Sequence, residues 1–109
     1  MTQPATNSQR TLAENEFFLR DVPAAGALLV ADAVAVFRVG DRLCAIQSRC
    51  PHRGGPLDEG QLEGTTLTCP WHGAQFDVCT GALVRGPAET PLETYHMTVD
   101  GEIGRIEVE

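Results

Sequence analysis

The stretch VAVFRVGDRLCAI, residues 34–46, indicates the fold class of this chain most clearly. Apolar residues alternate on each side of Gly40-Asp41, as they do in the two arms of a β-hairpin with a tight turn. The stretch YHMTVDGEIGRIEV, residues 95–108, repeats this pattern about Asp100-Gly101. Two such hairpins predict a domain built from antiparallel strands.

The rest of the chain adds short β-like runs at close intervals, and no segment keeps a helical apolar period beyond about two turns. We expect strands over residues 17–20, 27–30, 33–39, 43–47, 65–68, 74–78, 94–99 and 103–108. Pieces rich in glycine and proline are expected to be loops on this frame, over residues 50–60, 69–73 and 85–91. Many short strands with frequent turns indicate an all-β domain, either an antiparallel sandwich or a barrel.

Length and composition suit one domain with a single packed core, since the chain has 109 residues and 42% hydrophobic content. Residues 1–16 are polar and lack the apolar region of a secretory signal, so we expect a tail there and one domain over residues 17–109. No apolar run reaches the roughly 18 residues of a membrane span. A cytoplasmic, reducing location is therefore expected, and disulfides are rare in such a compartment.

The chain is acidic, with 8 Lys+Arg against 15 Asp+Glu and a formal net charge of −7. Such a surface repels nucleic acid and anionic membranes, and it attracts basic proteins. Acidity also keeps a protein soluble without serving any partner. Charge alone therefore argues against nucleic-acid and membrane binding, and it leaves open whether a basic partner exists.

Two loops each bring a cysteine close to a histidine. The loop CPHRGGPLDEG, residues 50–60, contains Cys50-x-His52, and CPWHGAQFD, residues 69–77, contains Cys69-x-x-His72. Thiolate and imidazole are common metal ligands, so the paired loops predict a metal centre on these four side chains. The alternative is a pair of unrelated cysteines with two surface histidines, which would require the same coincidence twice.

The spacing bears on which metal the four side chains would hold. Structural zinc sites usually separate paired ligands by about two to four residues, and Cys-x-His is tighter than that. A two-iron cluster removes the difficulty, because the cysteine and the histidine of one loop can bind different irons. A structural zinc module with no redox role stays open as an alternative.

The pattern C-x-H followed by C-x-x-H resembles that of the Rieske [2Fe–2S] family, in which two histidines replace two cysteines on one iron. The resemblance covers about residues 17 to 109. It implies a Rieske-like antiparallel β-sandwich with a loop-built subdomain that binds one [2Fe–2S] cluster per chain. By this resemblance Cys50 and Cys69 hold the inner iron, and His52 and His72 hold the outer iron near the surface.

Residues around the expected ligands suit such a cluster. Pro51 and Pro70 stiffen the backbone after each cysteine. We expect Gly54, Gly55 and Gly73 to let main-chain N–H groups approach the cluster sulfurs. The stretch GPAETP at residues 86–91 matches the family's third, proline-containing loop over the cluster.

The other cysteines and the third histidine are not expected to be ligands. Cys44 lies in a hairpin arm and Cys79 in a turn, VCTG, so both are expected to be structural or incidental. His96 is opposite in phase to Tyr95 and Met97 on a predicted strand and should face solvent.

The resemblance implies a soluble one-electron carrier like the ferredoxins of bacterial aromatic-ring-hydroxylating dioxygenase systems. Those carriers pass electrons from a flavin reductase to a terminal oxygenase. A cluster whose irons are all ligated by protein has no open site for substrate, and the chain lacks a G-x-G-x-x-G dinucleotide fingerprint. We therefore expect a monomeric electron-transfer component that is not catalytic alone. The small subunit of an assimilatory nitrite reductase, which shares the fold, stays an alternative.

Departures from the family pattern bear on the reduction potential. High-potential members carry a cysteine in each cluster loop, joined as a disulfide, and a serine and a tyrosine that donate hydrogen bonds to the cluster. Here those positions are Gly55, Trp71, Ala74 and Phe76. The resemblance thus implies a potential toward the lower end, about −150 mV, of the Rieske range.

Overall fold

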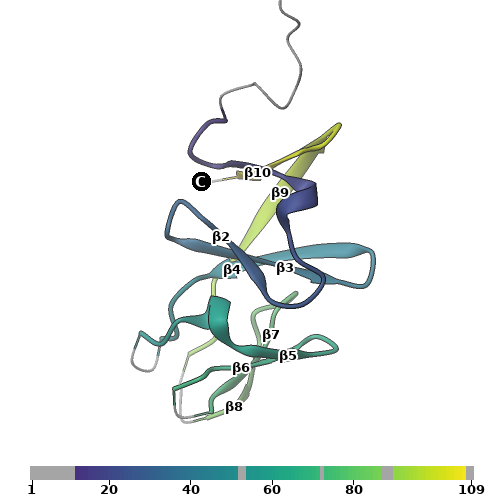
Figure 1. The fold of residues 1–109 in the computed structure, drawn as a ribbon. Coiled ribbons are helices and arrows are strands. Elements are labelled where there is room, and N and C mark those ends of the chain that lie inside the picture. Colours follow the sequence, from purple (N-terminus) through teal and green to yellow (C-terminus); the bar gives the residue numbers. More distant parts are fainter. Residues whose placement is uncertain (1–11, 52–53, 72, 87–89, 108–109) are drawn as a thin grey trace, which may run out of the picture.

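The computed structural model describes residues 12–51, 54–71, 73–86 and 90–107. These residues form two antiparallel sheets and two short 3₁₀ helices (Figure 1), which confirms the predicted all-β class. No helix among them is long and apolar enough to cross a membrane. Most of the predicted tail, residues 1–11, lies outside the described part, so the prediction of a tail there stays a prediction.

The larger sheet has six strands in the order β1-β10-β9-β4-β3-β2. Its strands are β1 (Glu16–Phe18), β2 (Ala27–Val30), β3 (Val34–Val39), β4 (Arg42–Gln47), β9 (Thr94–Asp100) and β10 (Ile103–Glu107). The helix η2 (Leu19–Asp21) follows β1, where the sequence predicted a longer strand.

Both predicted hairpins are present in this sheet. Strands β3 and β4 turn through Gly40-Asp41, and Gly40 has φ +62°, a left-handed conformation that suits glycine. In the other hairpin Asp100 pairs with Ile103, so the turn lies at Gly101-Glu102, one residue later than the sequence indicated.

The smaller sheet lies in the chain between β4 and β9, which pair with each other directly. Its order is β5-β6-β7-β8, with β5 (Gln61–Glu63), β6 (Thr66–Thr68), β7 (Gln75–Asp77) and β8 (Leu83–Arg85). The helix η3 (Leu57–Glu59) precedes it. Strands β5 and β8 were not predicted, because a three-residue strand shows too little alternation to be recognised in sequence.

Strands β3 and β4 are buried on both faces, which explains their nearly continuous apolar sequence. On one face Phe37 and Ile46 pack with Leu67 and Phe76 of the smaller sheet. On the other face Val34, Val36 and Ala45 join a second core. The second core also contains Phe17, Val22, Val30 and Ile106. The hairpin β3–β4 is therefore the shared wall between the two halves of the domain.

An ion pair anchors β1 to β10. Glu16 is 8% exposed, and its carboxylate accepts hydrogen bonds from Arg105 Nη2 at 2.8 Å and from the Ala13 backbone N–H at 2.9 Å. The carboxylate in turn raises the pKa of the Arg105 guanidinium.

The same pair of strands is also closely packed. Gly104 lies under the Phe17 ring, where an added Cβ would stand 2.5 Å from a ring carbon. Strand β1 begins at Glu16, which is the last residue of the segment predicted to be a tail.

Candidate metal centre

The fold brings Cys50 and Cys69 together. Cys50 follows β4, Cys69 follows β6, and both are free cysteines that are 3% and 2% exposed. The two thiols are close enough for Cys50 to raise the pKa of Cys69. His52 and His72 lie outside the described residues, so the ligand assignment of all four side chains stays a prediction.

The two cysteine loops share one backbone arrangement. The Cys50 N–H donates to the carbonyl of Gly55 at 2.8 Å, and the Cys69 N–H donates to that of Ala74, also at 2.8 Å. In both loops the hydrogen bond spans five residues. The fourth residue after each cysteine is a glycine with positive φ, +75° at Gly54 and +77° at Gly73. Each loop is therefore folded back on itself so that its cysteine lies at the base.

Gly54 and Gly73 meet a backbone requirement, and the predicted approach of their N–H groups to cluster sulfurs stays a prediction. A Cβ at either position would meet no protein atom within 4 Å, so crowding by the protein does not explain these glycines. Their positive φ angles explain them instead, because side-chain-bearing residues rarely adopt this conformation. Each loop therefore has a glycine at this position because its backbone is left-handed there.

Gly55 is the position of close approach. A Cβ there would stand 2.9 Å from Cys69 Sγ, closer than real Cβ contacts, and 3.1 Å from Cγ of Trp71, closer than most of them. Positions 55 and 71 are thus adjacent across the two loops. They are the positions that cysteines occupy in high-potential relatives, according to the resemblance drawn from the sequence. Trp71 packs over Gly55 but is 48% exposed, so it shields this side only in part.

The residues present fit a thiolate-bound iron group. Burial raises the pKa of the Cys69 thiol, and this outweighs the lowering effect of the hydrogen bond that the Trp71 backbone N–H donates to its sulfur. Two buried thiols in contact, with a backbone donor aimed at one sulfur, match the donor set and hydrogen bonding of iron–sulfur sites. Among the described residues no three His, Cys, Asp or Glu side chains gather as a metal site. The predicted histidines are outside that part of the chain.

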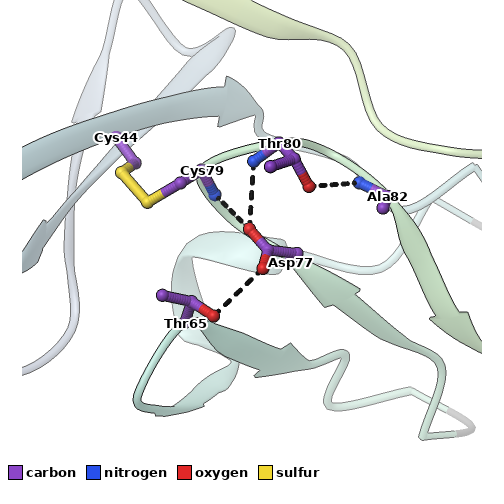
Figure 2. Close-up of a disulfide and its surroundings, with 6 residues drawn as sticks. All are labelled: Cys44, Thr65, Asp77, Cys79, Thr80 and Ala82. Carbon is purple, nitrogen blue, oxygen red and sulfur yellow. Dashed lines mark hydrogen bonds between the residues drawn. A yellow bond between two sulfur atoms is a disulfide. The ribbon is translucent and has the colours of Figure 1, made fainter.

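Cys44 and Cys79 form a disulfide (Figure 2), so the expectation that the cysteines would not pair was wrong for these two. Cys44 lies on β4, and Cys79 lies in the turn between β7 and β8. The bridge therefore ties the larger sheet to the smaller one. The two residues are 35 positions apart, and only the packing of one sheet on the other brings them together.

The turn that carries Cys79 is organised by Asp77, which the sequence analysis did not single out. Figure 2 shows its carboxylate accepting hydrogen bonds from the backbone N–H groups of Cys79 at 2.9 Å and Thr80 at 3.0 Å. The Thr65 hydroxyl donates to the second oxygen at 3.0 Å. These hydrogen bonds lower the pKa of the Asp77 carboxyl, and the one from the Thr80 N–H contributes most. An aspartate that opens a turn before Thr-Gly was the signal available in the sequence.

His96 is exposed on β9, as predicted from its phase. Of the loop GPAETP, residues 87–89 lie outside the described part, so its place over the cysteines stays a prediction.

Comparison with known proteins identifies the family. The chain matches the Rieske [2Fe–2S] domain over residues 8–96. It is 41% identical over 71 residues to Ferredoxin CarAc of Metapseudomonas resinovorans, a match covering 64% of this chain and 66% of CarAc. It is 40% identical over 84 residues to the 3-phenylpropionate/cinnamic acid dioxygenase ferredoxin subunit of Escherichia coli strain K12, covering 74% of this chain and 79% of that subunit.

Solved structures show the same architecture. The Sphingomonas yanoikuyae B1 ferredoxin superposes with a TM-score of 0.79 at 28% identity, covering 84% of this chain and 94% of its own. The ferredoxin of carbazole 1,9a-dioxygenase from Nocardioides aromaticivorans IC177 gives 0.76 at 30% identity, covering 87% and 96%. A Rieske domain implies a [2Fe–2S] cluster, so the zinc alternative is set aside. Because the family match spans well over half of the sequence, the chain belongs to the Rieske [2Fe–2S] domain family.

Proposed function

We propose that this chain is the ferredoxin component of a multicomponent aromatic-ring dioxygenase system. It would carry one electron at a time from a reductase, expected to be a flavoprotein, to a terminal oxygenase. The observation that carries the proposal is the pair of matching loops with buried, adjacent Cys50 and Cys69 thiols, in a chain 40% identical over 84 residues to a named dioxygenase ferredoxin subunit.

In this proposal Cys50 and Cys69 bind the inner iron, and His52 and His72 bind the outer one. When bound, a [2Fe–2S] cluster supplies a one-electron redox couple. The protein's part is to bury the cysteines and to donate the Trp71 N–H to the Cys69 sulfur. Gly55 leaves room for the second loop to close against the first. The exposed edge of these loops is the proposed place of electron exchange.

A carrier is favoured over a catalyst by the relatives, which are named as ferredoxins and ferredoxin subunits of dioxygenases. One solved relative is described as a complex of reduced oxygenase and oxidised ferredoxin in carbazole 1,9a-dioxygenase, with 32% identity and a TM-score of 0.72. The same relatives argue against the alternative that this chain is the small subunit of an assimilatory nitrite reductase.

A monomeric state and a cytoplasmic location belong to the same proposal. In a reducing compartment the Cys44–Cys79 bridge would have to resist reduction, and of its two cysteines Cys44 is only 5% exposed whereas Cys79 is half-buried. Poor access is one property that protects a disulfide from thiol exchange.

The proposal is tested with purified holoprotein and the two other components of a dioxygenase system. We expect the flavoprotein reductase to bleach the visible spectrum of this protein in the presence of NADH, and the oxygenase to restore it. Substrate hydroxylation should then depend on the amount of this protein added. Reduction without reoxidation by any oxygenase would contradict the proposed role.

A further inference from the structure

A groove of about 450 Å³ lies beside the two cysteine loops. Its walls come from separate parts of the chain: Leu29 at the end of β2, Asp32 in the following turn, Ser48 after β4, Asp58 and Glu59 on η3, and Trp71. The groove thus adjoins the loops proposed to exchange electrons, and the proposed function does not yet assign it a ligand.

One part of the groove is apolar and open to solvent. Trp71 is 48% exposed and Leu29 is 39% exposed, and both are among the exposed large hydrophobic residues of the described chain. Exposed tryptophan is enriched where proteins bind each other, because it offers a large rigid face with little entropy to lose. The apolar part is therefore suited to contact with a partner.

The other part of the groove carries negative charge that the described residues do not neutralise. Asp32, Asp58 and Glu59 line it, and no described residue forms an ion pair with any of them. Arg49 is the one described basic residue in the lining, and its guanidinium donates to the Gly54 carbonyl at 3.4 Å. The groove therefore has an excess of carboxylates beside an aromatic ring.

A buried serine, Ser48, also lines this groove. Ser48 is 4% exposed; its backbone N–H donates to Ala33 at 3.0 Å and its carbonyl accepts from Leu57 at 2.9 Å. Ser48 lines the groove, and its side-chain hydroxyl has no hydrogen-bond partner among the described residues. A buried polar group of this kind is costly unless something bonds to it.

We infer that this groove receives an arginine side chain of the redox-partner protein. A guanidinium complements this groove in two ways. Its flat cationic face can lie on the Trp71 ring, and its several N–H groups can donate to the carboxylates and to the Ser48 hydroxyl. The inference rests on the proposed function, because it gives the electron-exchange face its specific contact.

The first experiment needs no partner protein. Holoprotein is titrated with the peptide acetyl-Gly-Arg-Gly-amide and with the same peptide containing citrulline, which keeps the shape of arginine but not its charge. Binding is read by calorimetry. We expect the arginine peptide to bind at least about tenfold more tightly, and Ser48→Ala and Asp58→Asn each to reduce that preference. Equal binding of the two peptides, or no binding of either, would overturn the inference.

The second experiment uses the oxygenase of a dioxygenase system as electron acceptor. The groove variant Asp58→Asn/Glu59→Gln is compared with Asp100→Asn/Glu102→Gln, which removes the same charge from the β9–β10 hairpin, and Figure 1 shows that the tip of this hairpin lies away from the smaller sheet. We expect the groove variant to raise KM for this protein about tenfold with little change in kcat, and the hairpin variant to change KM less than about twofold. Equal effects of the two variants would mean that only net charge matters.

The outcomes separate the inference from the proposed function. If no oxygenase accepts electrons from the unaltered protein, the proposed function fails, and the peptide titration alone decides whether the groove binds arginine. If electrons are transferred normally but arginine and citrulline peptides bind alike, the function stands and the inference fails. The reduction potential and visible spectrum of each variant are measured as a control, and both should match those of the unaltered protein.

Discussion

At the scale of single residues, neighbouring glycines in the first cysteine loop serve different physical needs. Gly54 has a left-handed backbone conformation in open space. At Gly55, by contrast, Cys69 Sγ is so close that a Cβ would not fit. The sequence predicted that glycine was needed at both positions. It did not distinguish the two reasons, because backbone angles and contacts across loops are not visible in a single sequence.

Substituting each glycine separates the two needs. Gly54→Ala should lower the free energy of unfolding by about 1 kcal/mol, the usual cost of a left-handed non-glycine residue, and leave iron content unchanged. Gly55→Ala should reduce the iron bound per chain, because the new methyl group would displace Cys69 or Trp71. Iron and acid-labile sulfide analysis measures this, and equal iron loading of both variants would contradict the contact argument.

By the resemblance, Ala74 and Phe76 stand where high-potential relatives carry hydroxyl donors to the cluster, and this predicts a low potential. Ala74 is 1% exposed, and its carbonyl accepts the Cys69 N–H, so this residue closes the second cysteine loop. A hydrogen bond to cluster sulfur favours the reduced form. If one bond contributes about 1–2 kcal/mol of difference between redox states, Ala74→Ser should raise the midpoint by roughly 40–90 mV. Voltammetry at pH 7 should place the unaltered protein near about −150 mV; a value above about +100 mV would refute the argument.

At the scale of elements, what the sequence revealed depended on strand length and on distance along the chain. The long hairpins were predicted because their alternation runs over many residues, and β5 and β8 were missed because they are too short to alternate. The paired loops were recognised from local spacing. The Cys44–Cys79 bridge was not, because it joins elements of two sheets that only tertiary packing brings together.

Removing that bridge should affect stability without removing the cluster. Cys44→Ser/Cys79→Ser should keep the visible spectrum and iron content, since Cys50 and Cys69 remain as free thiols. For a separation of 35 residues, loss of the bridge should lower the free energy of unfolding by about 4 kcal/mol on the chain-entropy model. Denaturant titration of both proteins checks this. Bleaching of the double variant during purification would show that one of these cysteines serves the cluster.

The Asp77 turn should make stability depend on acid pH. Its pKa is lowered in the fold, so the ionised carboxylate contributes stability above its unfolded value of about 3.9, and this contribution is lost as pH falls through the folded pKa. Asp77→Asn should therefore be less stable than the unaltered protein near pH 7, and the difference should shrink below about pH 4. Urea titrations at several pH values measure the difference. A constant gap across that range would contradict the role of the charge.

At the scale of the whole molecule, the hairpin β3–β4 joins a supporting sheet to the small sheet that carries the second cysteine loop. Its two buried faces explain why one stretch of sequence indicated the fold. The disulfide links the same two parts, and the groove lined by Trp71 and Asp58 opens beside the cysteine loops. The two proposals therefore concern neighbouring surfaces, the cysteine loops for electron exchange and the groove beside them for partner binding.

The central claim is that Cys50, Cys69, His52 and His72 together hold one two-iron cluster. Pulsed EPR of the reduced protein tests it most directly, because nitrogen bound to iron couples to the unpaired electron. The account predicts two inequivalent histidine nitrogen couplings, with one lost in His52→Ala or His72→Ala if any cluster survives. A reduced cluster without nitrogen coupling, or a colourless protein that contains zinc in place of iron, would contradict it.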